Sequence, residues 1–242
     1  MEQRITLTEA VRRRKSTRSY DMSGLTKEEL SQIMEYVDSI SPLLPGIKAK
    51  VELVGANDVK SMMKWRAPHY LCLYAEDSDA GLMNIGFVYE QLVLYMTTLN
   101  IGTCWATSVS PKEKHEEDGT KWATVIAFGK ARGEDVLREP EQAKRKAPNE
   151  VYDKKDDALE AARLAPSSMN NQPWRFEHKG DSVLVYCKKQ GLLKKWMVAQ
   201  NRIDIGIALG NIKAVKDTFH FSLPDKAVEK NGYTLMGEIR FK

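Results

Sequence analysis

The chain has little cysteine, which limits the kinds of site it can build. Only three of its 242 residues are cysteine, at positions 72, 104 and 187. They form no Cys-x-x-Cys pair, and no histidine or cysteine cluster has the spacing of metal ligands. The sequence therefore predicts neither a disulfide framework nor a bound metal.

No long segment is wholly apolar either. The most apolar one, from about Leu82 to Ile101, contains Asn84, Glu90 and Gln91, which are costly in lipid. It predicts a buried helix rather than a membrane span. The N-terminus is polar and basic with no apolar stretch after it, so we expect no signal peptide and a cytoplasmic protein that does not contact a membrane.

What the sequence does contain is a mild basic excess in two clusters. The formal net charge is +4, and 42% of the residues are hydrophobic, enough for a real core. Basic residues gather between Arg12 and Arg18 and again at Lys144, Arg145 and Lys146. Such clusters bind nucleic acid, but they serve equally well for a single phosphate group.

Hydrophobic periodicity and breakers predict alternating helices and strands. Helices are expected over 8–15, from Thr26 to before Ser41-Pro42, and over 86–99, 156–164 and 203–219. Strands are expected over 51–54, 70–75, 124–128, 174–177, 182–186 and 233–241. Thr26 and Glu29 have the spacing of a capping box at the start of the second helix.

The two ends of the chain also match each other weakly. Asn84-Ile85-Gly86 corresponds to Asp204-Ile205-Gly206, and Ser41-Pro42 to Ala165-Pro166. The order helix, Pro-broken loop, strand, apolar helix and strand recurs, with an offset of about 110 to 124 residues. The pattern predicts a duplication, with one half over 1–132, a basic linker over 133–155 and a second half over 156–242.

Two motifs carry the chemistry. Arg14-Lys15-Ser16-Thr17-Arg18 places three cations and two hydroxyls together, which suits a phosphate monoester. The alternative is a solvated basic face or a nucleic-acid-binding arm. The second motif, Pro166 to Trp174, encloses small hydroxyl and amide residues between two prolines, which suits a planar heterocycle edged by carbonyls and ring nitrogens. Its alternative is a helix-to-strand turn.

Together these motifs resemble those of the FMN-dependent nitroreductase family. Arg14 to Tyr20 matches R-x-S-x-R-x-F/Y, and Ala165 to Trp174 matches A-P-S-x-x-N-x-Q-P-W. Asn100 to Trp105 matches G-x-G-T-C-W, with Asn100 where the family often has glycine, and Lys144 to Pro148 matches a basic segment that ends in proline. The second of these matches is the most specific.

The position of the second motif is unusual. In the family it follows the first after one helix and a turn, whereas here most of a domain separates the two. Family members are usually homodimers in which the partner subunit supplies the P-S-S-x-N loop. Where the first half should carry that loop it has Ser41 to Gly46, with no hydroxyl or amide after the proline. The resemblance therefore implies an α+β fold of two fused, pseudo-symmetric halves with mainly antiparallel sheets. Such an intrachain pseudo-dimer would retain one complete flavin site.

The resemblance also implies a set of site residues. Arg18 would stabilise the reduced flavin, and no side-chain acid–base pair is required because the cofactor carries the difficult step. The FMN-binding residues implied are Arg14, Lys15, Ser16, Arg18, Thr103, Ala106, Thr107, Ser108, Lys144, Arg145, Lys146, Pro166, Ser167, Ser168, Met169 and Asn170.

The function expected is that of an FMN-dependent NAD(P)H oxidoreductase acting by a ping-pong mechanism on nitroaromatic or quinone-like acceptors. Either NADH or NADPH would be the reductant, and the chain would be a monomeric pseudo-dimer or a homodimer. Alternatives are a flavin-binding sensor or carrier without turnover, and a basic nucleic-acid-binding module. Cys104, His69 and His115 are also candidates for redox or proton chemistry, although a buried structural thiol and ordinary histidines are the simpler interpretations.

Overall fold

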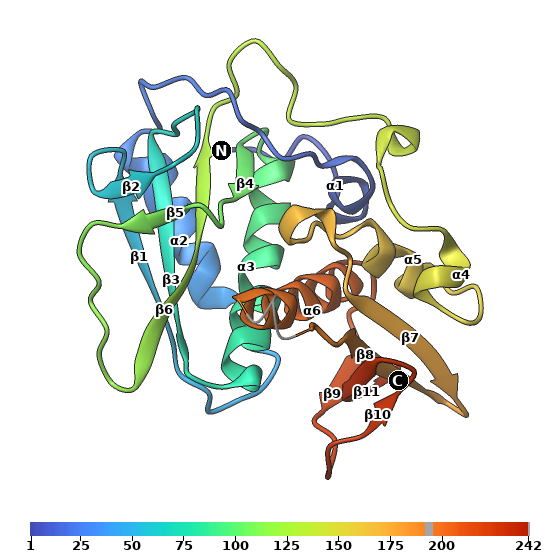
Figure 1. Ribbon diagram of the computed structural model, residues 1–242. Coiled ribbons are helices and arrows are strands. Elements are labelled where there is room, and N and C mark those ends of the chain that lie inside the picture. The colour runs from blue at the N-terminus through green and yellow to red at the C-terminus, as the bar shows by residue number, and fades with distance from the viewer. Residues whose placement is uncertain (192–195, 242) are drawn as a thin grey trace.

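Two larger antiparallel sheets lie on either side of a central pair of crossed helices (Figure 1). The computed structural model describes residues 1–191 and 196–241. The mixed α/β fold with antiparallel sheets that the sequence predicted is confirmed.

The first sheet is built by the N-terminal part of the chain. Its strand order is β1 (Ala49–Gly55), β3 (His69–Glu76), β6 (Thr120–Gly129) and β4 (Gly102–Trp105), and every pair is antiparallel. The central strand β3 is buried on both faces. Leu71 and Leu73 face the main core, while Cys72 and Tyr74 belong to a smaller cluster under a two-stranded ribbon of β2 (Val59–Ser61) and β5 (Val109–Pro111).

The second sheet is built by the C-terminal part of the chain. β7 (Trp174–Lys179) and β8 (Ser182–Lys188) form the predicted hairpin, and Gly180 provides the left-handed backbone conformation of its turn at φ +57°. β8 pairs with β11 (Tyr233–Phe241), whose other edge carries β9 (Phe219–Ser222) and β10 (Glu229–Lys230). Strands β2, β4, β5, β9 and β10 were not foreseen, because each is too short to show an alternating pattern.

Most helix starts follow their capping signals. Thr6 caps α1 (Leu7–Arg13) and Thr26 caps α2 (Lys27–Ser39), each with a complete capping box. Asp156 caps α5 (Asp157–Leu164) by accepting from the N–H of Ala158 at 2.7 Å. Along the chain from β6 to β7, α5 is accompanied by three shorter helices: η1 (Pro140–Gln142), α4 (Pro148–Val151) and η2 (Ser168–Asn170).

The central helices α3 (Asp79–Thr98) and α6 (Trp196–Val215) are longer at their N-terminal ends than predicted. The prediction of 86–99 missed the start of α3, where Ser78 accepts from the N–H of Gly81 at 3.0 Å. The prediction of 203–219 missed the start of α6 and overran its end, because Phe219 pairs with Phe241 in the second sheet. In the part of the chain that the structure describes, no helix is long and apolar enough to cross a membrane.

The two central helices touch through a reciprocal pair of glycines. A Cβ on Gly86 would lie 2.2 Å from the carbonyl oxygen of Ile203, and a Cβ on Gly206 would lie 2.0 Å from that of Met83. Each glycine thus meets the residue three positions before the other. Any side chain here would push the helices apart, so the close crossing requires glycine at both positions.

The same helices hold two loops by matching hydrogen bonds. Asn84 Oδ1 accepts from the backbone N–H of Leu44 at 3.2 Å, in the loop after α2. Asp204 Oδ1 accepts from the backbone N–H of Ser168 at 3.0 Å, in the loop after α5. Asn84 and Asp204 occupy the positions that the sequence comparison of the two halves had matched.

Candidate functional site

The segment that contains Arg14 to Arg18 lies beside strand β4. Ser16 forms a parallel bridge with Thr103, and the N–H of Thr17 donates to the carbonyl of Thr103 at 2.9 Å. A Cβ on Gly102 would lie 2.5 Å from Thr17 Oγ1, so glycine is needed for this close approach. The first motif and the Gly-Thr-Cys-Trp strand are therefore side by side in space.

Residues 131–138 cover the other edge of the same segment. Arg14 is bridged to Leu137, and Tyr20 to Ala131. Glu134 accepts from the backbone N–H groups of Arg18 at 3.1 Å and Ser19 at 3.2 Å, and its carboxylate pairs with Lys15 at 3.0 Å. Glu134 thereby neutralises the charge of Lys15 and fixes the backbone around Arg18.

The loop after α5 has an unusual backbone. Met169, Asn170 and Gln172 have φ values of 51°, 55° and 47°, in the left-handed region that most residues avoid. The loop is held by Ser167 Oγ, which accepts from the N–H of Gln172 at 2.9 Å. Strain of this kind at a methionine is typical of a functional loop, where the surrounding structure compensates its cost.

The basic segment closes over this loop. Arg145 donates from Nε to the carbonyl of Leu164 at 3.1 Å and from Nη1 to Asn170 Oδ1 at 3.0 Å. Asn170 in turn donates from Nδ2 to the carbonyl of Lys144 at 3.0 Å. The segments near residues 145 and 168 are thus joined by direct hydrogen bonds, while the segment near residue 14 is joined to β4 and to residues 131–138.

These segments enclose a cleft of about 670 Å³. A volume of this size suits a cofactor or drug-sized ligand, for which clefts of roughly 300–1,000 Å³ are usual. All the residues predicted to bind FMN line it except Thr103 and Lys146. Residues from both ends of the sequence therefore meet at one site.

Thr103 and Lys146 have other contacts. Thr103 is buried in β4, opposite Phe128 of β6. Lys146 donates from Nζ to the carbonyl of Gln172 at 2.7 Å, which ties the basic segment to the base of the loop. Both positions shape the site without facing the cleft.

Other lining residues were not foreseen. They include Met63, Glu134, Arg138, Gln200 and Asp204. Arg138 lies in the segment interpreted as a linker, where no motif marks it. The only signal for Asp204 was its place in the Asp204-Ile205-Gly206 match, which concerned the duplication rather than the site.

Three arginines give one end of the cleft its positive charge. Arg14 is only 2% exposed and its Nε has no hydrogen-bond partner among the described residues. Arg138 likewise has Nε and Nη2 buried without a partner in that part of the chain. Burial, and then the charges of Arg138 and Arg14, lower the pKa of Arg145. Three neighbouring guanidinium groups, of which Arg14 and Arg138 have buried donors without a partner among the described residues, form a site that favours an anion.

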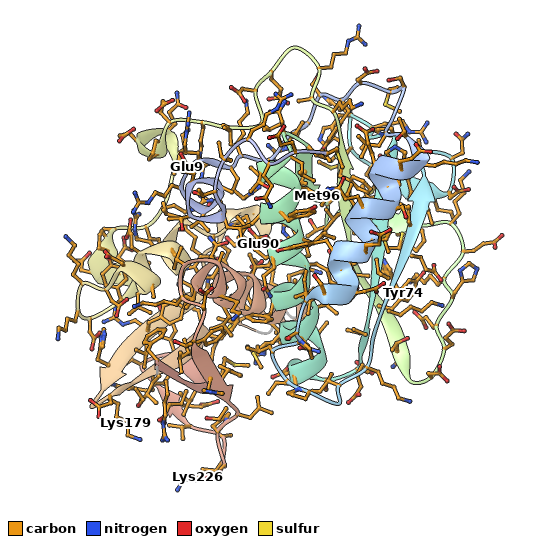
Figure 2. The ribbon with its side chains drawn as sticks, turned by 180° about the vertical axis from the view of Figure 1, so that it is seen from behind. Glu9, Tyr74, Glu90, Met96, Lys179 and Lys226 are labelled. Carbon is orange, nitrogen blue, oxygen red and sulfur yellow. The ribbon has the colours of Figure 1, made fainter. Side chains whose placement is uncertain are left out.

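A buried carboxyl group lies behind these arginines. Glu90 of α3 is fully buried near the centre of the molecule (Figure 2) and accepts from Trp105 Nε1 at 2.8 Å. Burial raises its pKa to about 7, although the charge of Arg14 and the Trp105 hydrogen bond act in the opposite direction. At neutral pH Glu90 is therefore only partly ionised and does not cancel the positive charge of the cleft.

Cys104 and His69, two further candidates for redox or proton chemistry, have the burial and contacts of structural residues. Cys104 lines the cleft, but it is buried and burial raises the pKa of its thiol, which keeps it protonated. His69 accepts from the backbone N–H of Leu25 through Nε2 at 2.8 Å, and burial lowers its pKa. His69 is thereby held as the neutral ring.

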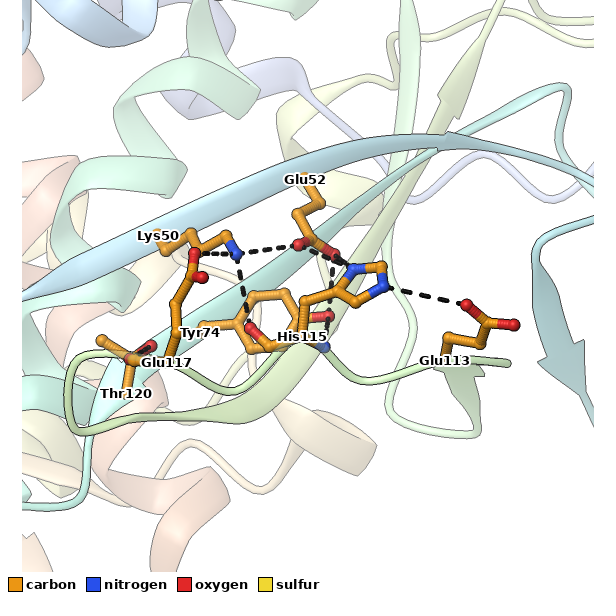
Figure 3. Close-up of polar contacts among 7 residues, drawn as sticks. All are labelled: Lys50, Glu52, Tyr74, Glu113, His115, Glu117 and Thr120. Carbon is orange, nitrogen blue, oxygen red and sulfur yellow. Dashed lines mark hydrogen bonds and ion pairs between the residues drawn. The ribbon is translucent and has the colours of Figure 1, made fainter.

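His115 belongs to a polar network on the first sheet (Figure 3). Its Nδ1 lies 3.0 Å from Glu52, which also accepts from the Tyr74 hydroxyl at 2.9 Å. Lys50 joins this network through Glu52 at 3.0 Å and through Glu117. These residues do not line the cleft, and within residues 1–191 and 196–241 no group of three His, Cys, Asp or Glu side chains is arranged to hold a metal ion.

Comparisons with known proteins agree with this picture. A family model described as "Putative TM nitroreductase" matches residues 6–215. A solved structure titled "putative nitroreductase" from Thermotoga maritima MSB8 is 20% identical, with a TM-score of 0.66, and the alignment covers 100% of this chain and 96% of that one. At this level of identity it shows the shared fold. No curated protein sequence matches.

Shorter structures match less closely. A nitroreductase family protein from Clostridium difficile 630 is 14% identical with a TM-score of 0.48, covering 60% of this chain and 96% of that one. An FMN-dependent nitroreductase from Clostridium difficile R20291 is 16% identical with a TM-score of 0.43, covering 54% of this chain and 91% of that one.

Proposed function

The chain belongs to the nitroreductase family described as "Putative TM nitroreductase", and on this premise we propose that its cleft binds one FMN and that it acts as an FMN-dependent NAD(P)H oxidoreductase. The observation that carries the proposal is the cleft itself. It brings a cluster of arginines with unused donors together with a strained hydroxyl- and amide-rich loop.

The arginine end of the cleft fits a phosphate monoester. Arg14 and Arg138 have buried donors that no described residue accepts, and Ser16 adds a hydroxyl beside Arg14 at 3.4 Å. Lys144 and Arg145 would close over the phosphate from the other side. Lys15 would contribute less charge than the motif suggests, because Glu134 already pairs with it.

The opposite end fits a flat heterocyclic ring. Pro166 to Asn170 would cover one face of the ring, and Ala106, Thr107 and Ser108 would lie along its edge. Ser168 Oγ is buried without a partner in the described structure, so it is available to a ligand. These loops orient the ring and exclude water from one of its faces.

When bound, FMN would supply hydride and electron transfer from NADH or NADPH to a nitroaromatic or quinone-like acceptor. The side chains of the cleft would bind, orient and stabilise charge, and a ping-pong order follows if reductant and acceptor use the same open face. Cys104 would remain a protonated thiol and take no part.

We expect Arg18→Ala to lower the rate of flavin reduction by about tenfold, and the flavin potential by roughly 30 mV. Arg18 lines the cleft and its backbone is fixed by Glu134, so its charge would stabilise the negative charge that reduction places on the ring. The effect is limited because the side chain is exposed to solvent. Stopped-flow reduction and a redox titration measure the two quantities.

Arg18→Lys is the matched control, since it keeps the charge and should recover most of the potential. An unchanged potential in Arg18→Ala would remove Arg18 from this role.

We also propose that the chain is a fused pseudo-dimer with halves over 1–132 and 156–242. The reciprocal contacts of Gly86 and Gly206, and the matching bonds made by Asn84 and Asp204, support a pseudo-twofold axis through the helix crossing. Only the half that carries Ser167 and Ser168 would offer a ring-binding loop, so one FMN per chain is expected.

The cheapest test is to purify the protein and record its absorption spectrum. A yellow protein with flavin bands, about one FMN per chain and NAD(P)H oxidation on addition of an acceptor is the expected result. FMN content near two per chain would overturn the single-site proposal. Bound FMN without NAD(P)H oxidation would make the protein a flavin carrier or sensor, and failure to bind FMN at all would overturn the function itself.

A further inference from the structure

Asp204 is a buried carboxyl group in the wall of the cleft. It is 2% exposed, it lies on α6, and Oδ1 accepts from the backbone N–H of Ser168 at 3.0 Å. Oδ2 is buried and has no hydrogen-bond partner in the part of the chain that the structure describes. The Ser168 hydroxyl, on the residue that Asp204 holds, is also buried and without such a partner.

The other half of the chain shows that a carboxyl group is not needed to hold such a loop. Asn84 makes the matching bond to the N–H of Leu44 with an uncharged amide, at a length of 3.2 Å. An amide at position 204 would accept the Ser168 bond equally well. The carboxyl group is instead found on the side that carries the hydroxyl- and amide-rich loop.

A carboxylate at this place would be costly. Charged groups buried without a cation lose their hydration, and none of the ion pairs among the described residues includes Asp204. The buried Cys187 thiol on β8 interacts with Asp204, and Arg202 of the same helix is paired with Asp79 of α3 at 2.9 Å. Neither compensates the charge, because Asp79 already neutralises Arg202.

Resting on the proposed FMN site, we propose that Asp204 is a positioning residue that works as an uncharged carboxylic acid. In this form it holds Ser168 through Oδ1. Its protonated Oδ2 and the Ser168 hydroxyl together supply donors on the ring side of the cleft, where the carbonyls and nitrogens of the ring would accept them.

The direction of its titration agrees with this role. Burial raises the pKa of Asp204 from 3.8 to about 8, and the Ser168 hydrogen bond only partly opposes this. The folded protein therefore holds a proton that the unfolded chain releases near pH 4. The contribution of Asp204 to the free energy of unfolding therefore falls as the pH rises from about 4 to about 8, and this loss is complete above that range.

The decisive variant is Asp204→Asn, which keeps an acceptor for Ser168 and a donor in place of Oδ2 but cannot ionise. In the FMN-free protein, we expect its Tm to exceed that of the wild type by an amount that grows from pH 5 to pH 8.5. FMN affinity, measured by quenching of flavin fluorescence, should be within about threefold of the wild type at pH 6.5. By pH 9.5 the wild type should bind about tenfold more weakly than the variant.

The phosphate and the ring titrate in the same way with both proteins, so the ratio of the two dissociation constants isolates Asp204. The inference would be overturned if the ratio of dissociation constants stayed the same at every pH. It would also be overturned if the difference in Tm between variant and wild type stayed the same at every pH. FMN binding by the wild type would then still support the proposed function, whereas absence of FMN binding at every pH would overturn both.

Asp204→Ala and Asn84→Ala form a matched pair. Each removes the acceptor for one loop, and both should lower Tm. Only Asp204→Ala should weaken FMN binding, by about tenfold at pH 6.5, because only its loop faces the cleft. Equal FMN affinity in the two variants would show that Asp204 has a purely structural role.

Discussion

Arg14→Ala weakens FMN binding by roughly 100-fold, the largest effect we expect from any single cleft residue. Arg14 is 2% exposed and its Nε has no partner among the described residues, so its guanidinium is already desolvated and oriented toward the cleft. Charge-assisted hydrogen bonds of this kind contribute about 1.5–3 kcal/mol each, and 2.7 kcal/mol corresponds to about 100-fold in affinity. Equilibrium titration of the FMN-free protein with FMN measures the change.

Two controls, one variant and one ligand, separate phosphate binding from loss of charge or fold. Arg12→Ala removes the same charge from the exposed face of α1, the helix that precedes Arg14, and should leave FMN affinity within about twofold. Riboflavin, which has no phosphate, should bind Arg14→Ala and the wild type with similar affinity. If Arg14→Ala weakened riboflavin and FMN equally, Arg14 would act on the ring or on the fold rather than on the phosphate.

Gly86→Ala and Gly206→Ala should each destabilise the protein by about 3 kcal/mol, because overpacking costs about 1–3 kcal/mol and here the added atom meets backbone. The new Cβ would lie 2.2 Å from Ile203 oxygen in one case and 2.0 Å from Met83 oxygen in the other. Neither helix can yield locally, so α3 and α6 must separate. A fall in Tm of roughly 10 °C is expected for a chain of this size.

Gly210→Ala is the matched control on α6. A Cβ there would lie 3.0 Å from the Phe87 oxygen and 3.1 Å from Glu90 Cβ, so a small shift accommodates it and the gain in helix propensity offsets part of the cost. We expect a change below about 1 kcal/mol. The pseudo-twofold relation also predicts that Gly86→Ala and Gly206→Ala lose similar amounts of stability. A large difference between the two losses would count against that relation.

Local signals accounted for most of the secondary structure. The capping box at Thr26 placed one helix start, and the closing strand over 233–241 was predicted to the residue. The start of α3 and both ends of α6 were predicted poorly. The apolar pattern of these helices marks where they are buried on all sides, whereas their ends depend on Ser78 as a cap and on Phe219 joining a sheet.

In the candidate site, too, some residues could be predicted from the sequence and others could not. The motifs around Arg14 and Ser168 could be recognised in the sequence, because only certain residue types suit the binding of a phosphate or of a flat ring. Arg138 and Asp204 could not be recognised there, since neither stands in a motif and each reaches the cleft only because residues distant along the chain fold around it.

The family, the antiparallel α/β class and most of the cleft residues thus follow from the order of the amino acids, because periodicity, capping and motif chemistry are local properties. The meeting of residues 14, 138, 145 and 204 around one cleft does not. It depends on the glycine crossing of α3 and α6, which sets how far apart the two parts of the chain lie. The burial of Asp204 and Glu90, and hence their raised pKa values, arises only from that packing.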